Sequence, residues 1–265
     1  MTASWIVAFL FVSAAHEPPA HQQQTKQPPE KRETAEEAEQ RTVHDFADLS
    51  RSRAQLLAQV EALARKYPGK DGEKFQEYAK VLRQMVAEDE ARRQKPPKPM
   101  EQMTQEERIA ELIYRLRDQT AQKEPGQIYP PITSIFTDWP KNGKPGATPA
   151  DELLRLGTAG VPQLIDALAD QRFSRALKYC GWDTVLRVNH CADQILCRIA
   201  HRNIGAILVS RAEDNDIAAA QTATRRWWAD YQKKGERQML IDGTEAGDEY
   251  SAAQAEALVL KYPDA

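Results

Sequence analysis

The chain has few aromatic residues, few cysteines and no strong excess of charge of either sign. Aromatic side chains make up 7% of the 265 residues, and the formal net charge is −3. A general nucleic-acid-binding protein is normally strongly basic, so this balance argues against nucleic acid as a partner. Apart from one run close to the N-terminus, no segment approaches the roughly 20 apolar residues of a transmembrane helix. We therefore expect no stable insertion into a membrane.

Signatures of the common enzyme classes are also missing. The chain contains no Gly-rich phosphate-binding loop, no nucleophile elbow and no His-Glu-x-x-His motif. Asp166 and Asp170 stand one helical turn apart, as the paired carboxylates of glycosidases can, but no cleft-forming context accompanies them. The sequence therefore predicts a protein without catalytic activity and without a cofactor.

The apolar run near the N-terminus is typical of an export signal. Residues Trp5–Val12 are apolar without interruption, and the small residues Ser13–Ala15 follow. The run is far too short to cross about 30 Å of hydrocarbon as a helix. We interpret residues 1–15 as a signal peptide and expect the protein in the periplasm or outside the cell. Residues 16–33, rich in Pro, Gln and charge, are predicted to be a disordered spacer.

A charged helical hairpin is predicted for residues 34–95. Thr34-Ala-Glu-Glu37 has the form of a capping box, which opens a helix. One apolar stripe continues to Tyr67, where Pro68-Gly69 ends it; its members are Val43, Phe46, Leu49, Leu56, Val60 and Leu63. A second helix is expected from about Glu73 to Arg93. The short turn makes the two helices antiparallel neighbours, and the hairpin is a candidate oligomerisation element.

A Pro-rich linker at residues 96–104 is the predicted domain boundary, and it overlaps Lys95-Pro-Pro-Lys-Pro99. The capping box Thr104-Gln-Glu-Glu107 then opens a helix. Residues 121–148 lack clear periodicity but are too apolar for a free linker, so we expect an irregular connection packed against the helices. Residues 105–265 are predicted to form one helical domain.

The stretch 153–172 has the pattern of a helical repeat. Two short apolar-periodic helices meet at Gly157-Thr-Ala-Gly160, and Pro162 lies just inside the second one. This pattern resembles one unit of a HEAT/armadillo-type repeat, which implies an α-solenoid that binds other macromolecules on an extended surface. In that family an Asp and an Arg at the turn between paired helices form hydrogen-bond ladders between repeats. Asp170 and Arg172 match that position.

Residues 173–188 depart from the repeat pattern. A turn at Gly181 is flanked by strand-tolerant residues, which indicates an inserted β-hairpin or ordered loop. Insertions of this kind emerge on one face of a helical stack and commonly carry binding contacts. The residues of the candidate binding surface are Tyr179, Trp182, Arg187 and, from a later helix, Trp228.

Three further helices are expected after the insertion. The first begins with Asn189 as its N-cap and ends near Arg202, the second extends from about Asp216 to Lys234, and the last begins near Ser251. Adjacent residues of a helix point about 100° apart. Of the neighbouring residues Trp227 and Trp228, one is therefore expected in the core and the other at its flank.

The three cysteines leave two interpretations open. Cys191 and Cys197 on one helix would lie about 9 Å apart along its axis, which is too far for a disulfide. The alternatives are a Cys180–Cys191 bond and three buried thiols. Cys197 and His201, one turn apart, are weak candidates for a metal site, because two ligands from one helix do not complete one.

The sequence as a whole predicts an all-α fold: a helical hairpin followed by a short HEAT-like α-solenoid with an inserted β-hairpin or loop. The predicted function is that of an exported, non-catalytic adaptor or scaffold that binds a protein partner through residues 173–188. The alternative is a protein that binds a metal or small ligand with its Cys/His helix.

Overall fold

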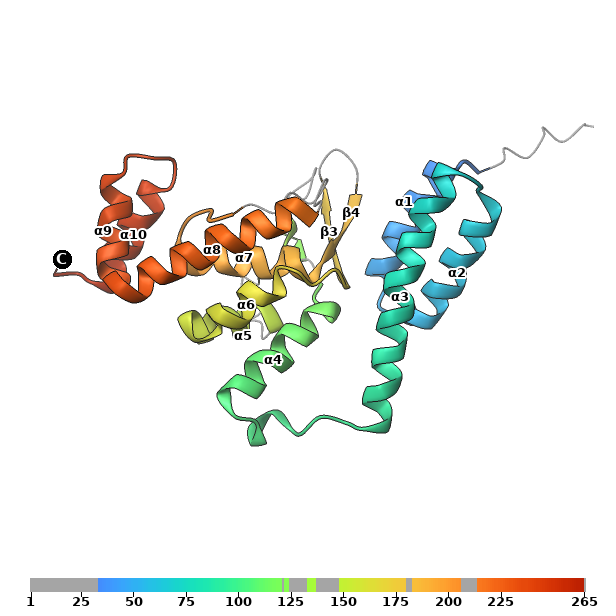
Figure 1. The fold of residues 1–265 in the computed structure, drawn as a ribbon, viewed down its shortest axis with the longest axis horizontal. Coiled ribbons are helices and arrows are strands. Elements are labelled where there is room, and N and C mark those ends of the chain that lie inside the picture. Colours follow the sequence, from blue (N-terminus) through green and yellow to red (C-terminus); the bar gives the residue numbers. More distant parts are fainter. Residues whose placement is uncertain are drawn as a thin grey trace, which may run out of the picture. The chain divides into compact units, whose positions relative to one another are not determined.

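The computed structural model describes residues 33–120, 122–123, 133–136, 148–179, 183–205 and 214–264. Residues from Thr34 onwards belong to one compact unit, which is mostly helical and contains two small antiparallel pairs of strands (Figure 1). The predicted helical character and the inserted hairpin are therefore confirmed, whereas the solenoid arrangement stays a prediction. The predicted signal peptide, residues 1–15, lies outside the described residues.

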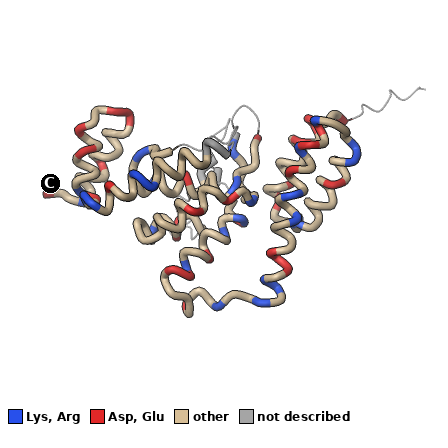
Figure 2. Tube along the Cα trace, viewed as in Figure 1, with Lys and Arg blue, Asp and Glu red and all other residues tan. Residues whose placement is uncertain are grey.

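Residues 34–95 form three helices: α1 (Ala35–Ala47), α2 (Arg53–Lys66) and α3 (Lys70–Gln94). The capping box at Thr34 is confirmed, because the Thr34 side chain accepts from the Glu37 backbone N–H and the Glu37 side chain accepts from Thr34. The prediction of one helix continuing to Tyr67 is wrong. Acidic and basic residues are interspersed along all three helices (Figure 2).

Local hydrogen bonds explain the break between α1 and α2. The Asp48 carboxylate accepts from both the backbone N–H and the hydroxyl of Ser50, at 2.9 and 2.7 Å. Ser52 then starts α2 with a capping box to Gln55. Short polar side chains compete in this way with the helical backbone pattern. Leu49, which the periodicity put on the buried stripe, is 66% exposed as a result.

The chain continues through η1 (Met100–Gln102), α4 (Gln105–Arg115) and η2 (Leu116–Asp118). The capping box at Thr104 is confirmed, and Ile109, Leu112 and Leu116 are buried as the apolar spacing predicts. In the stretch expected to be irregular, the described residues include the short paired strands β1 (Gln122–Lys123) and β2 (Thr133–Ser134).

The repeat-like stretch folds into α5 (Pro149–Leu156), η3 (Gly157–Gly160) and α6 (Val161–Ala167). Thr148 caps α5 with Asp151 as its partner, and Pro149 occupies the first turn. Gly157 ends α5 with a φ of 58°, a left-handed conformation that glycine adopts without steric cost. The local signals at both ends of α5 are thus confirmed.

The insertion is a β-hairpin made of β3 (Phe173–Tyr179) and β4 (Asp183–Arg187). The strands are antiparallel, with Leu177 opposite Val185 and a register irregularity between Phe173 and Leu177. The hairpin contacts α1 on both of its strands. It therefore connects the repeat-like region to the three N-terminal helices.

The remaining helices are α7 (Val188–Ala200), α8 (Asp214–Lys234), α9 (Glu236–Glu245) and α10 (Ser251–Lys261). The prediction of Asn189 as an N-cap is wrong: Arg187 is the cap, its N–H donates to His190 Nδ1, and Asn189 is buried within the first turn. The sequence reading also missed α9. Gly235, with a φ of 79°, ends α8, but the chain enters a new helix at once.

Apolar side chains form two buried clusters. The larger one is built from α4, α5, α6, α7 and part of α8, together with Ala176 and Leu186 of the hairpin. The smaller one is built from α1, α2 and α3 together with Phe173 and Val185 of the hairpin. The segments on either side of the predicted linker thus share a core through the hairpin, and oligomerisation through residues 34–95 stays a prediction.

Candidate functional site

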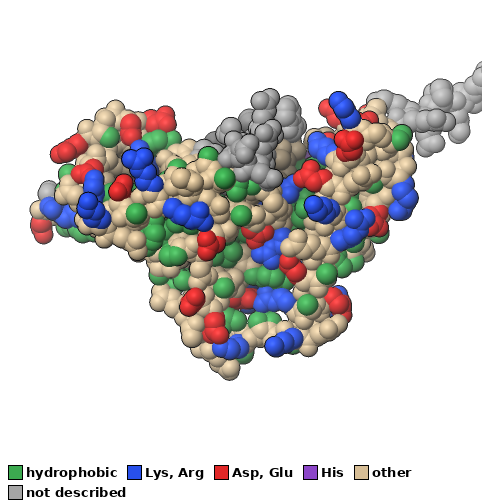
Figure 3. Space-filling view, viewed as in Figure 1, with side chains coloured by type: hydrophobic (Ala, Val, Ile, Leu, Met, Phe, Trp, Pro, Cys, Tyr) green, Lys and Arg blue, Asp and Glu red, His purple; other side chains and the backbone are tan. Residues whose placement is uncertain are grey.

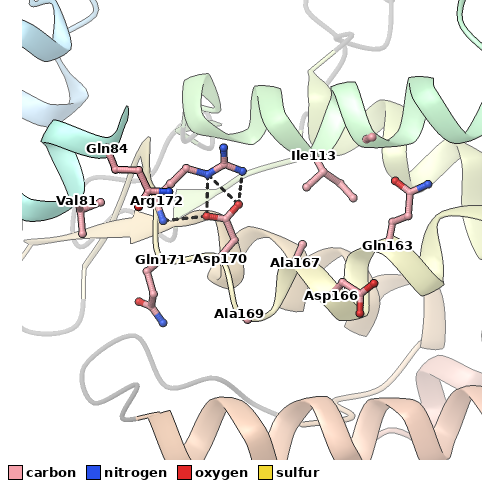
Figure 4. Close-up of a pocket in the computed structure, with 11 residues that line it drawn as sticks. Val81, Gln84, Ile113, Gln163, Asp166, Ala167, Ala169, Asp170, Gln171 and Arg172 are labelled. Atoms are coloured by element: carbon pink, nitrogen blue, oxygen red, sulfur yellow. Dashed lines mark hydrogen bonds and ion pairs between the residues drawn. The ribbon is translucent and has the colours of Figure 1, made fainter. Parts of the chain in front are cut away.

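An open groove of about 730 Å³ lies where α3, α4, α6 and the turn after α6 meet (Figure 4). Its aliphatic lining residues are Val81, Ala110, Ile113, Ala167 and Ala169. Val81 packs against the smaller apolar cluster, whereas Ile113 and Ala167 belong to the larger one. The groove therefore lies between the two cores and has walls that both cores support.

Three glutamines from three different elements add amide groups to the groove: Gln84 of α3, Gln163 of α6 and Gln171 of the following turn. Gln84 Nε2 donates to Glu88 at 2.9 Å, and Gln163 Nε2 donates to the backbone oxygen of Glu106 at 3.2 Å. A side-chain amide has two donor hydrogens and one acceptor oxygen. Each of these residues therefore keeps hydrogen-bonding capacity for a ligand.

Asp170 and Arg172 form one end of the groove (Figure 4). Arg172 Nε and Nη2 donate to the Asp170 carboxylate at 2.9 and 2.5 Å, and Nη1 donates to Glu88 of α3 at 2.8 Å. Burial alone would lower the pKa of Arg172, but the two carboxylates outweigh it and raise the pKa. The pair proposed as a repeat ladder thus lies at the turn between α6 and β3 and joins that turn to α3.

Behind this end, further ion pairs connect α3 to the residues that follow α4. Arg117, whose side chain is 1% exposed, contacts Glu88 at 3.1 Å and Asp89 at 2.6 Å. Arg53 of α2 contacts Asp89 at 3.0 Å. Burial tends to raise the pKa of Glu88 and Asp89, but the neighbouring guanidinium groups outweigh it and lower both values. These carboxylates are therefore stable as anions.

The ring of Tyr114 organises three of the cations. The guanidinium carbons of Arg92, Arg117 and Arg172 lie 3.8, 4.4 and 5.4 Å from its centroid, within the range of cation–π attraction. Acidic and basic side chains lie next to each other between α3 and α4 in the space-filling view (Figure 3). We call the group of Arg53, Glu88, Asp89, Arg117, Asp170 and Arg172, with Tyr114, the ionic network.

Of the predicted binding surface, the structure describes the side chains of Arg187 and Trp228, and each packs among different neighbours. Arg187 is engaged inside the fold: it donates to Gln171 O at 3.0 Å and to Glu77 at 2.8 Å, and it lies 4.7 Å above the Phe173 ring. Trp228 stacks on Tyr231, with ring centroids 5.3 Å apart, and both pack against the larger cluster. Trp182 and the side chain of Tyr179 lie outside the described residues.

The inward face of the hairpin is buried against the N-terminal helices. Phe173 packs on the rings of Phe46 and Tyr78, with centroids 4.7 and 5.5 Å apart. Arg175 donates to the backbone oxygens of Phe46 and Arg51, at 2.9 Å each. These side chains hold the fold together and are not available to a partner. The opposite side of the hairpin is also buried at its base, where Ser174, Ala176 and Leu186 are at most 1% exposed.

The Cys/His helix supplies little of what a metal site needs. Cys197 Sγ lies 4.0 Å from Asp193 and 3.8 Å from Asn203, and His201 ends α7 with a φ of 53°. Burial raises the pKa of Cys197 to about 11, with Asp193 adding to the effect, so its thiol stays protonated at neutral pH. Among the residues that the structure describes, no three His, Cys, Asp or Glu side chains are grouped to hold a metal ion.

The disulfide proposed from the sequence is not tested by the structure. Cys191 is a buried free thiol whose pKa burial raises to about 12. Its proposed partner, Cys180, lies outside the described residues.

Of the residues that line the groove, the sequence singled out Asp166, Asp170 and Arg172, and it did not predict the groove itself. Asp170 and Arg172 were identified from the repeat pattern, but Val81, Gln84 and Gln163 carried no signal of their own. They come from helices whose approach depends on the ionic network and on the shared core. A glutamine on the exposed side of a helix looks like any solvated residue in the sequence.

In the described ranges, no helix combines the length and apolar character that crossing a bilayer requires. Comparison of the chain with protein-family models, with curated proteins and with solved structures finds no match.

Proposed function

We propose that the protein is an exported, non-catalytic adaptor that binds a segment of another protein in the groove between α3, α4 and α6. The observation that carries this proposal is the lining of the groove: an aliphatic floor, amide groups on three sides and an ion-paired end. Binding sites are typically concave and largely apolar, with a few polar groups that fix orientation. The groove is concave and combines aliphatic side chains with polar groups of this kind.

Rigidity of the groove walls supports the same proposal. The ionic network fixes α3 to the turn that carries Asp170 and Arg172. Both apolar clusters continue beneath the lining. A site whose walls are ordered before binding loses less conformational entropy when the ligand arrives. The groove can therefore bind a partner without first reorganising the fold.

Site-directed photo-crosslinking in the native host tests the groove as a partner site. A benzoylphenylalanine replaces Gln163, which lines the groove, and in a matched control it replaces Gln232, an exposed residue of α8 outside the lining. We expect one protein to be crosslinked at position 163 and not at position 232. Crosslinking of the same proteins at both positions would contradict a specific site there.

A steric variant tests the groove with the purified partner. Ala110 is an exposed lining residue, so Ala110→Trp fills the groove without disturbing the core. We expect partner affinity to fall about fivefold or more, since overpacking of this kind costs roughly 1–3 kcal/mol. Ala229→Trp, on an exposed position of α8, should leave affinity unchanged. Equal affinity of Ala110→Trp and the unchanged protein would refute the proposal.

Export is a separate part of the proposal and has its own test. The apolar run Trp5–Val12 supports it. We expect the protein recovered from the periplasm or medium to begin near residue 16, which intact mass spectrometry measures directly. If the protein keeps its first 15 residues and remains in the cytoplasmic fraction, export is refuted. The proposal that the groove binds a partner does not depend on this result.

A further inference from the structure

We infer that the groove binds its partner as an extended, strand-like segment and selects a Lys or Arg side chain of that segment with Asp166. This inference rests on the proposed function, because it specifies the kind of partner that the same groove accepts. Three observations carry it: the amides around the groove, the small size of its aliphatic lining and the distribution of charge.

The amide groups favour an extended backbone. Gln84 and Gln163 each donate one hydrogen bond through Nε2, and the Gln171 side chain makes none among the described residues. An α-helix satisfies its own backbone N–H and C=O groups internally. An extended segment presents both groups at its sides, where glutamine amides can donate to one and accept from the other. The lining is thus suited to a strand rather than to a helix.

The aliphatic lining fits small side chains at alternate positions. Ala110, Ala167 and Ala169 offer little depth, and Val81 and Ile113 supply the larger surfaces on opposite walls (Figure 4). Successive side chains of an extended segment point to opposite faces, so only every second residue meets the lining. We expect valine or alanine at those positions, because a larger side chain would lift the backbone away from the glutamines.

The charges of the lining select a cation. Asp170 is already paired with Arg172, and Arg172 is also paired with Glu88. Asp166 differs: its side chain is 80% exposed and lies 3.6 Å from Arg225, which is itself 56% exposed. Exposed pairs of this kind contribute little. The Asp166 carboxylate can therefore accept a basic side chain of the partner, while the lining contains no guanidinium that lacks a carboxylate.

Titration with defined peptides tests the inference by protein NMR. The probes are the peptides Ac-Ala-Val-Ala-Lys-Ala-Val-amide and Ac-Ala-Val-Ala-Glu-Ala-Val-amide, together with a side-chain-stapled helical peptide of the same composition as the first. We expect the Lys peptide to shift backbone amide signals of Ile113 and Gln163 in a saturable way. Its affinity should exceed that of the Glu peptide about two- to fivefold, because an exposed ion pair contributes only modestly.

Two variants test whether Asp166 causes the preference for the Lys peptide over the Glu peptide. Asp166→Asn should reduce the preference for the Lys peptide to nearly none, because it removes the carboxylate and keeps the shape. Asp230→Asn, at an exposed acidic position of α8 outside this groove, should preserve the preference. Tighter binding of the stapled helix, equal binding of the Lys and Glu peptides, or no groove shifts with any probe would each overturn the inference.

Failure of the inference and failure of the proposed function give different results. A partner that crosslinks at position 163 but binds there as a helix, or without a basic residue, contradicts the extended cationic segment and leaves the function standing. Absence of any crosslinked partner at position 163 contradicts the proposed function itself, regardless of the peptide affinities.

Discussion

Arg117 is a fully buried cation at the centre of the ionic network. Its side chain pairs with Glu88 and Asp89, donates to the Met85 backbone oxygen at 3.2 Å and lies against the Tyr114 ring. A buried charge is tolerated only when its partners compensate for the loss of water. Removing this side chain takes a guanidinium away from both carboxylates, which then keep Arg172 and Arg53, and it leaves a large buried volume empty. The position is therefore sensitive to change.

Arg117→Ala should lower the free energy of unfolding by about 3 kcal/mol or more, the typical cost of removing one partner of a buried ion pair. Urea denaturation followed by circular dichroism measures it. Arg83→Ala is the matched control, because Arg83 pairs with Glu61 at 2.8 Å on the surface, with its side chain 58% exposed. Its effect should stay below about 1 kcal/mol. Equal losses for the two variants would show that burial is not the decisive factor.

Gly72 illustrates how a tertiary contact reverses a local preference. It lies in the first turn of α3, where alanine is ordinarily favoured over glycine by about 1 kcal/mol. A Cβ atom at Gly72, however, would lie 2.1 Å from the backbone oxygen of Tyr67. Since a backbone oxygen cannot move aside as the end of a side chain can, α3 would have to shift away from the preceding turn.

Gly72→Ala should therefore destabilise the protein by roughly 1–3 kcal/mol, the usual cost of a steric overlap in a packed site. Thermal unfolding monitored by circular dichroism provides the measurement. Glu73→Ala tests the neighbouring exposed position and should change stability by no more than about 0.5 kcal/mol. A gain in stability for Gly72→Ala would mean that helix propensity dominates there.

At the scale of elements, capping boxes explain where α1, α2, α4 and α5 begin. In each box the N-cap side chain accepts from a backbone N–H in the first turn, and the N-cap backbone N–H donates to the side chain three residues later; the caps are Thr34, Ser52, Thr104 and Thr148. The Ser52 cap has a further consequence, because it starts α2 immediately after the Asp48 turn. The two features together convert one apolar stripe into two helices.

Ser52→Ala should cost about 1 kcal/mol, the usual loss when an N-cap hydroxyl is removed. Hydrogen exchange should speed up for the backbone amide of Gln55, which loses its 3.2 Å bond to the Ser52 hydroxyl. Ser50→Ala is a useful comparison, because Ser50 bonds only within the turn and should affect Gln55 little. Unchanged exchange at Gln55 in Ser52→Ala would contradict the capping role.

At the scale of the whole molecule, the hairpin and the ionic network join the N-terminal helices to the repeat-like region. Phe173 enters the smaller cluster, and Arg172 reaches Glu88 of α3. These contacts make the free energy of unfolding depend on pH, and the direction follows from the pKa shifts of the carboxylates. The pKa values of Glu88 and Asp89 are lowered in the fold. Groups of this kind stabilise the folded state above their unfolded pKa and lose that contribution as the pH falls.

The free energy of unfolding should accordingly fall as the pH is lowered from 7 towards the depressed pKa values of the two carboxylates. Urea titrations at a series of pH values measure this slope. The double variant Glu88→Gln, Asp89→Asn should be less stable at pH 7 and should show a shallower slope below pH 5. An identical slope for the variant and the unchanged protein would show that other carboxylates govern acid unfolding.

Local signals in the sequence determined much of the secondary structure. Capping boxes, Gly157 and the apolar spacing of residues 105–116 act between neighbours within a turn or two of helix, so they can be read without the fold. The β-hairpin was also recognisable from its turn. The break after α1 was not predicted, because Leu49 continues the apolar periodicity across the turn that Asp48 and Ser52 form. Helix α9 was not predicted either, because Gly235 has the pattern of a helix C-terminus with no helix after it.

Only the tertiary structure decided where the hairpin packs and which residues form the groove. The sequence suggested that residues 173–188 face a partner, yet Phe173 and Arg175 are buried against α1. The groove combines Val81 and Gln84 with Ile113 and Gln163, from helices that are distant along the chain. Contacts of this kind arise from packing and from long-range ion pairs, whose energies depend on burial and on exact neighbours in space. No local pattern in the sequence encodes them.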